Sequence, residues 1–404
     1  MPVVCLYFQV HQPRRLRHYT FFDIDRVHTY EDAAANRRLL NRAAEKCCLP
    51  ANRILLDLIR SRAGAFRIAF SISGSLLEQF EKDRPDVLKS YRELADTGCV
   101  EFLNETYSHS LAFLFSPGEF RRQILLHQRK IKSLFGRMPT TFHHTGLTYN
   151  DHLAHIIEKM GCRAILAEGT KQVLNGLSPD CVYRPAGCQT VKLLFKNNLL
   201  SDDIAFHFSN QSRIHELLTA ETFARRIHSM NADHAVINLF IHFEVFEDHP
   251  LADSVMLDFL PDFSSVILSD SRFRFQTPGE VAASHDPVSV LGVPAALLQA
   301  DQDPGLTIWL GNAMQKDAVQ TLYHLEDSVR RRHNKQSLET WRMLQDSDHF
   351  RFMSTKRPAA GDAHRSFSPY FSPYDAYINY MNILDDFSVV LNKTPAYLRK
   401  EDHI

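Results

Sequence analysis

The stretch from Ile237 to Pro250 constrains the fold most, because a short apolar segment ends there abruptly in polar residues. Its first five residues, Ile237 to Ile241, are apolar apart from Asn238, which is typical of a buried parallel strand. The polar residues that follow are His242, Glu244, Glu247, Asp248 and His249. In an α/β barrel the carboxyl ends of the strands carry the functional groups, so this pattern predicts a barrel strand that leads into a site.

Apolar segments elsewhere in the chain share this pattern. Strands are predicted at Val3 to Val10, Phe66 to Ile72, Val100 to Leu103, Thr141 onward, Ala164 to Ala167, Val182 to Arg184, Val191 to Phe195 and Ala205 to Phe208. Helices are predicted at Asp32 to Ile59, Leu76 to Thr97 with a break near Pro85, Pro117 to Phe135, Asp151 to Gly161 and Glu216 to Met230. Strands that alternate with helices through short connections favour a parallel sheet that closes into a barrel.

The character of the sequence changes near Thr277, where a short helix is predicted to begin. Further helices are predicted at Asn312 to Arg332, Ser337 to Gln345 and Tyr374 to Asn392. We therefore expect two parts: an α/β barrel domain over residues 1–276, and a helical C-terminal region over residues 277–404 that packs on the barrel.

Composition and charge argue against several classes of protein. The 404 residues include 46 Lys and Arg against 47 Asp and Glu, so no nucleic-acid partner is indicated. No apolar run reaches about 18 residues, and the N-terminus has no basic segment before its apolar stretch, so neither a membrane span nor a signal peptide is expected. The seven cysteines form no CxxC pair, so we expect reduced thiols and a cytoplasmic protein.

Several short motifs occur in order along the chain. They are His11-Gln12-Pro13, Glu105 to Leu111 (ETYSHSL), Thr145 to Asp151 (TGLTYND), Leu200 to Phe206, His242 to His249 (HFEVFEDH), Thr277 to Val281, Trp309 to Gln315 and Ser347 to Phe350. Taken together they resemble the α-amylase branch of glycoside hydrolase family 57, over nearly the whole chain. The resemblance implies a distorted (β/α)7 barrel followed by a helical C-terminal region, and retaining hydrolysis of α-glucans.

The chain departs from the family pattern at both catalytic positions. Retaining hydrolysis needs two carboxyl groups roughly 5–5.5 Å apart, one as the nucleophile and one as the acid/base. Gly146 stands where the family has its nucleophilic Glu, and His242 stands where it has its acid/base Asp. An imidazole can donate a proton, with an ordinary pKa of about 6.5, but it cannot replace a missing nucleophile. We therefore predict that ordinary double-displacement activity is absent or very weak.

Polar and aromatic residues at the predicted strand ends still suit a sugar ligand. The candidate substrate-binding residues are His11, Gln12, Glu105, His109, Tyr149, Asn150, Glu244, His249 and Trp309. Their side chains offer donors and acceptors for sugar hydroxyls, and the indole offers a face for a pyranose ring. Our leading interpretation is a catalytically inactive family member that retains an α-glucan-binding cleft and acts in glycogen or starch metabolism.

Two alternatives remain open. The first is an active hydrolase or glucanotransferase in which Glu244 or Asp248 substitutes for a lost carboxylate, for instance by an inverting route. The second is a structural interaction protein whose cleft is vestigial. A metal site is not expected: His152 and His155 are three residues apart rather than four, and the adjacent pair His143-His144 matches no ligand pattern. No cofactor is expected either.

Overall fold

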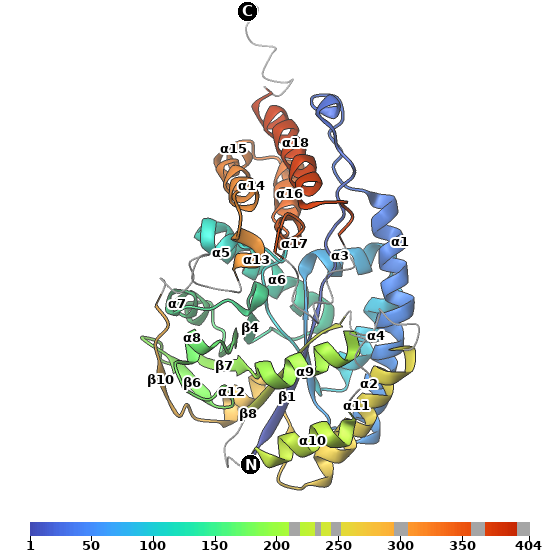
Figure 1. Ribbon diagram of the computed structural model, residues 1–404, viewed down its shortest axis with the longest axis vertical. Helices are drawn as coiled ribbons and strands as arrows, with labels where there is room; N and C mark the ends of the chain where they lie inside the picture. Colours follow the sequence, from blue (N-terminus) through green and yellow to red (C-terminus); the bar gives the residue numbers. More distant parts are fainter. Residues whose placement is uncertain (210–218, 231–235, 244–251, 295–305, 357–367, 394–404) are drawn as a thin grey trace, which may run out of the picture.

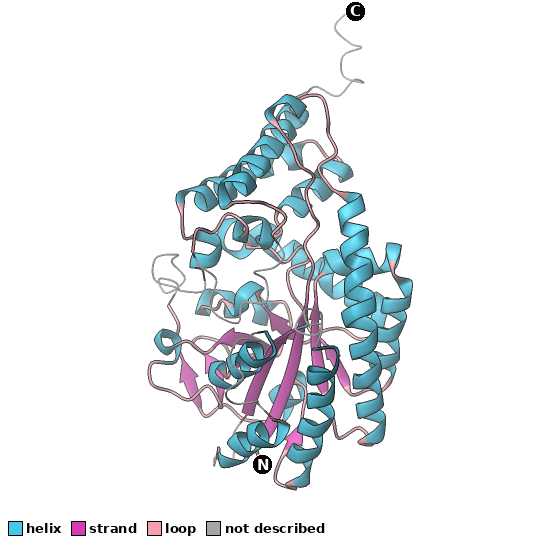
Figure 2. Ribbon diagram, turned by 45° about the vertical axis from the view of Figure 1, so that its right-hand side comes forward, coloured by secondary structure: helices cyan, strands magenta, loops and turns pink. Residues whose placement is uncertain are grey.

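A single sheet forms the centre of the protein in the computed structural model, which describes residues 1–209, 219–230, 236–243, 252–294, 306–356 and 368–393. Its strands are β1 (Val3–Val10), β2 (Ile68–Ile72), β3 (Val100–Phe102), β4 (Thr141–His143), β5 (Ala164–Glu168), β6 (Val182–Pro185), β7 (Lys192–Lys196), β8 (Val236–His242), β9 (Arg274–Phe275) and β10 (Ser289–Leu291). Helices surround this sheet, and a group of helices lies at one of its ends (Figures 1 and 2).

Seven of the strands are joined in a ring of parallel pairings. β1 pairs with β2 on one side and with β8 on the other, and β2 pairs with β3. Asn104, two residues after β3, bridges to Phe142 of β4. β4 then pairs with β5, β5 with β7, and β7 with β8 through Lys196 and Asn238. Followed in turn, these pairings return to β1, which confirms an α/β fold built on a parallel sheet.

The helices before residue 290 connect and cover the strands. They are α1 (Ala33–Ala43), α2 (Leu49–Ser61), α3 (Gly74–Asp83), α4 (Pro85–Asp96), α5 (Ala112–Phe115), α6 (Pro117–Phe135), α7 (Asp151–Lys159), α8 (Lys171–Leu174), α9 (Asn198–Ser209), α10 (Ala220–Ser229), α11 (Ala252–Ser269) and α12 (Pro278–Ser284). Short 3₁₀ segments lie at Phe21–Asp23 and Thr145–Leu147, and a π-helical segment lies at Ala44–Cys48.

Three predicted elements differ from the structure. The single helix predicted over Asn312 to Arg332 is divided at Leu325 into two helices. Ala205 to Phe208 is predicted as a strand, but it lies within helix α9. Asn197 caps this helix by accepting a hydrogen bond from the Leu200 backbone N–H at 3.0 Å, and Leu200 and Ile204 are buried four residues apart on one face. The helix predicted from Asp32 to Ile59 is interrupted by the π-helical segment Ala44–Cys48.

Alternate residues of β1 serve two different hydrophobic clusters, because successive side chains of a strand point to opposite faces. Leu6 and Phe8 pack with the surrounding helices. Tyr7 faces the space enclosed by the strands, where the centroid of its phenol ring lies 5.3 Å from that of the Phe240 ring in β8. All eight residues of β1 are buried, which explains why the sequence shows a continuous apolar run rather than alternation.

The C-terminal helices lie over the carboxyl ends of the strands (Figures 1 and 2). They are α13 (Thr307–Leu310), α14 (Ala313–His324), α15 (Glu326–Arg331), α16 (Lys335–Leu344), α17 (Ser347–Arg351) and α18 (Pro373–Asn392). The helical C-terminal region is thus confirmed, whereas the domain boundary at residue 276 stays a prediction; strand β10 lies beyond it and pairs with β6. Within the described ranges, no helix has the length and apolarity needed to cross a bilayer.

A buried carboxylate joins the C-terminal helices to the sheet-covering helices. Glu119 in the first turn of α6 is fully buried, and it accepts hydrogen bonds from Arg342 Nε at 2.6 Å and Arg330 Nη2 at 2.8 Å. Arg122 Nε donates a third bond at 3.2 Å. Burial raises the pKa of Glu119, but the hydrogen bonds and charges of Arg342, Arg330 and Arg122 outweigh it, so the pKa is lowered from its ordinary value of 4.5.

We predict that Glu119→Gln destabilises the protein by about 3 kcal/mol at neutral pH, because removing one partner leaves the arginines uncompensated. Since the folded pKa lies below the unfolded one, the ionic contribution is present above pH 4.5 and is lost as pH falls through the folded pKa. Urea unfolding of both proteins should therefore show a difference that shrinks below pH 4.5. A difference that is the same at every pH would contradict this account.

Candidate active site

The motif residues converge at the carboxyl ends of the parallel strands. His11 follows β1, Glu105 and His109 follow β3, Gly146 follows β4, and His242 ends β8. Two of these loops have strained backbones: His109 has a φ of 50° and Leu147, next to Gly146, a φ of 55°. Positive φ is uncommon for residues other than glycine and often accompanies functional sites.

Trp309 of α13 occupies the space in front of Gly146. A Cβ atom at Gly146 would lie only 2.2 Å from Trp309 Cη2 and 2.7 Å from Cζ3. Gly146 also has a φ of 63°, a backbone conformation that favours glycine. Position 146 therefore lacks a side chain and, with Trp309 in this place, has no room for one; that it is the nucleophile position stays a prediction from the motif.

His242 is held in its neutral form. Burial, followed by the positive charges of Arg351 and Lys196, lowers the pKa of His242 well below its ordinary value. The imidazole is therefore uncharged at neutral pH. An uncharged imidazole releases its one ring proton with difficulty, so His242 is a poor general acid. The predicted acid/base role of position 242 is therefore not one that this imidazole suits.

His11 is the centre of a buried polar network. Its ring stacks on that of His109 with the centroids 4.1 Å apart, and Gln9 Nε2 lies 3.2 Å from His109 Nε2. His11 Nδ1 lies 2.7 Å from Ser73 Oγ, and its Nε2 lies 3.3 Å from the carboxylate of Asp346. Burial lowers the pKa of His11, but Asp346 outweighs this effect through its charge and hydrogen bond, so the pKa rises to about 9.

Glu105 lies deeper in the same network and is almost fully buried. Its Oε2 accepts a hydrogen bond from Ser71 Oγ at 2.6 Å, and His143 Nδ1 lies 3.7 Å away. His109 Nδ1 lies 3.9 Å from Oε1. Burial raises the pKa of Glu105, but the neighbouring His109 and His143 outweigh that effect, so the pKa is well below its ordinary value. Glu105 is therefore an ionised carboxylate rather than a proton donor.

The remaining predicted sugar ligands have other roles in the described structure or lie outside it. Asn150 caps helix α7 by accepting a hydrogen bond from the Leu153 backbone at 2.8 Å, and the Tyr149 hydroxyl donates to Asp151 at 3.3 Å. Gln12 is half-buried beside His11. Glu244, Asp248 and His249 lie outside the described residues. The structure thus brings together His11, Glu105 and His109, and their sugar-binding role stays a prediction.

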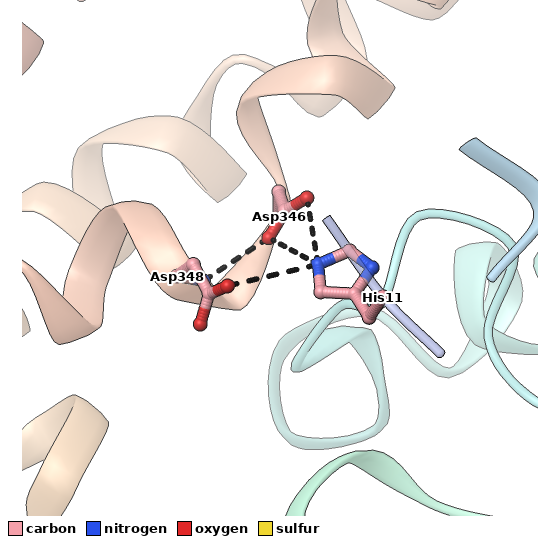
Figure 3. Close-up of side chains that lie close together, drawn as sticks. All are labelled: His11, Asp346 and Asp348. Atoms are coloured by element: carbon pink, nitrogen blue, oxygen red, sulfur yellow. Dashed lines mark hydrogen bonds and ion pairs between the residues drawn. The ribbon is translucent and has the colours of Figure 1, made fainter. Parts of the chain in front are cut away.

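Asp346 and Asp348 are not identified as site residues by the sequence, although Asp348 belongs to a recognised motif. Ser110, after β3, forms an antiparallel bridge with Asp346, and the Ser347 backbone N–H donates to the His109 carbonyl at 3.1 Å. These bonds hold the start of α17 against the loop after β3, so that both acids lie beside His11 (Figure 3). Of the two histidine pairs weighed as metal ligands, the adjacent pair has different partners: His143 lies beside Ser71 Oγ, whereas His144 is hydrogen-bonded to Thr148.

The fold and these motifs define a glycoside-hydrolase-like protein, and comparison with known proteins identifies the family. The family model described as "Glycosyl hydrolase family 57" matches residues 5–294. A protein of Methanocaldococcus jannaschii named "Putative alpha-amylase" is 31% identical over 402 residues, which cover 96% of this chain and 85% of that protein. The chain therefore belongs to glycosyl hydrolase family 57.

Solved structures support the same fold at low sequence identity. The branching enzyme of Pyrococcus horikoshii aligns with a TM-score of 0.68 and 13% identity, covering 95% of this chain and 88% of the enzyme. The α-amylase AmyC of Thermotoga maritima aligns with a TM-score of 0.63 and 12% identity, covering 96% of this chain and 93% of the amylase. The 4-α-glucanotransferase of Thermococcus litoralis aligns with a TM-score of 0.67 and 14% identity. This alignment covers 86% of this chain but only 56% of the enzyme.

We predict that Gly146→Ala destabilises the protein by about 1–3 kcal/mol, because the added methyl group collides with Trp309 and the backbone has positive φ. Most of the collision should disappear in the Trp309→Ala background, where only the cost of the backbone conformation remains. Urea midpoints of the two single variants and the double variant form the test. Additive effects would show that Trp309 does not occupy the space in front of Gly146.

Proposed function

We propose that this family 57 protein binds α-glucans in carbohydrate metabolism without cleaving them by the double-displacement route. The observation that carries the proposal is the contact between Trp309 and Gly146, which leaves no room for a nucleophile. The neutral His242 supports it at the second catalytic position. The names of its relatives, which include a branching enzyme and a glucanotransferase, point to α-glucans as the ligand class. We place this function in the cytoplasm, as its buried free cysteines favour.

The strand-end side chains support a role in ligand binding rather than chemistry. His11, His109 and Glu105 form a preorganised set of donors and acceptors whose orientations are fixed by Ser73, Gln9 and Ser71. Fixed polar groups of this kind suit hydroxyl recognition, because little conformational entropy is lost on binding. The described part of the site therefore fits recognition of a sugar without supplying a carboxylate pair in the family positions.

The test combines two measurements on the purified protein. In a reducing-sugar assay on amylose and glycogen, turnover should not exceed the rate of the protein-free control. In native gels that contain glycogen, migration should be retarded in proportion to the glycogen concentration. Retardation with no turnover supports the proposal, whereas turnover supports an active enzyme that uses displaced carboxylates. If the protein shows no retardation and no turnover, the result supports an interaction protein with a vestigial cleft.

We further predict how catalysis can be restored. The double variant Gly146→Glu, His242→Asp should stay inactive, because the carboxylate side chain introduced at position 146 has no space beside Trp309. Adding Trp309→Ala should provide the space and raise maltooligosaccharide hydrolysis above that of the double variant. Equal activity in the double and triple variants would contradict a blocking role for Trp309, and circular dichroism of both variants serves as the folding control.

A further inference from the structure

A compact set of metal-ligating atoms includes two motif residues, His11 and Asp348, together with Asp346. It consists of His11, Asp346 and Asp348, whose nearest side-chain nitrogen and oxygen atoms all lie within 4.8 Å of one another. His11 comes from the end of β1, and both acids come from the start of α17 (Figure 3). All three residues are buried, so their charges face one another rather than solvent.

The separations between His11 Nε2 and the two carboxylates match those of ligands around one ion. His11 Nε2 lies 3.3 Å from both oxygens of Asp346 and 3.8 Å from Asp348 Oδ2. Zinc binds imidazole nitrogen and carboxylate oxygen at about 2.0–2.2 Å, so two ligands at angles of about 100–120° lie roughly 3.1–3.8 Å apart. An ion can therefore enter between these groups without a large movement of the backbone.

The orientation of His11 is already that of a metal ligand. Its Nδ1 is hydrogen-bonded to Ser73 Oγ at 2.7 Å, which leaves Nε2 directed at the two acids. Metal-binding histidines almost always use their second ring nitrogen in this way, because the bond fixes both tautomer and ring angle. Asp346 is itself fixed, since it accepts a hydrogen bond from the Asp348 backbone N–H at 3.1 Å.

A small cavity reaches His11 and Asp348 of this set and has room for an ion with water. Its volume is about 50 Å³, and its wall includes His11, Gln12 and Asp348 among mainly apolar side chains. Organic ligands usually occupy pockets of about 300–1,000 Å³, whereas a single water needs about 10–15 Å³. Arg15 and Arg351 also line the cavity, so the open coordination position would suit an anionic ligand such as hydroxide.

We propose that His11, Asp346 and Asp348 form a binding site for a single divalent first-row metal ion, with Zn²⁺ as the best match. One imidazole and two carboxylates are ligands that Zn²⁺ and Mn²⁺ both accept, and a three-ligand site leaves a position for water. The proposal does not depend on glucan binding or on any catalytic activity.

Calorimetric titration of the EDTA-treated full-length protein with Zn²⁺ tests the site. We expect one equivalent to bind with a micromolar or lower Kd, and Asp348→Asn and His11→Gln to weaken binding at least tenfold. Ser73→Ala should weaken it less, as expected for a residue that orients a ligand. His28→Gln is the matched control, because His28 pairs with the carboxylate of Asp386 at 3.0 Å and is not one of the three proposed ligands, so this variant should bind Zn²⁺ as the unaltered protein does.

Cobalt provides a second readout that does not depend on the variants. Co²⁺ in a protein site of mixed nitrogen and oxygen ligands should give visible absorption bands that one equivalent of Zn²⁺ abolishes. Absence of stoichiometric Zn²⁺ binding, or equal Zn²⁺ binding by the unaltered protein and by both ligand variants, would overturn the proposal. Glycogen-gel retardation of the EDTA-treated protein separates this result from the fate of the glucan proposal.

Discussion

The pairing of β1 with β2 on one side and β8 on the other is the constraint on which the rest of the structure depends. Parallel strands in register end at the same edge, so the residues that follow each strand are brought together whatever their distance in sequence. The register places Val10 opposite Ile72 and Gln9 opposite His242. The meeting of His11, Ser73 and His242 at one end of the sheet follows directly from these hydrogen bonds.

The sequence predicts this framework well because the signal is local. Buried strands such as β1 and β8 appear as apolar runs, and the motifs mark their ends. Local patterns predict secondary structure poorly when the segment is short. The four residues Ala205 to Phe208 resemble a strand when read alone, but the cap at Asn197 begins a helix that includes them. The position of Asp346 could not be predicted either, because its bridge to Ser110 joins segments far apart in the sequence and leaves no local pattern.

The relation between Gly146 and Trp309 shows what motif comparison misses. A motif assigns Trp309 to sugar stacking, whereas the structure places its ring against the backbone of Gly146. The absence of a side chain at Gly146 and the position of Trp309 are therefore physically linked. Such coupled positions are not additive, so neither residue can revert to a larger or a smaller side chain independently of the other.

The arginine contacts of Glu119 have a consequence for synthesis on the ribosome. Arg330 and Arg342 are made 211 and 223 residues after Glu119, so during translation the carboxylate of α6 lacks two of its three arginine partners. An uncompensated carboxylate resists burial and remains hydrated. The first turn of α6 therefore gains its full set of ionic partners only after α16 has left the exit tunnel, so we expect this end of the sheet to mature late in the nascent chain.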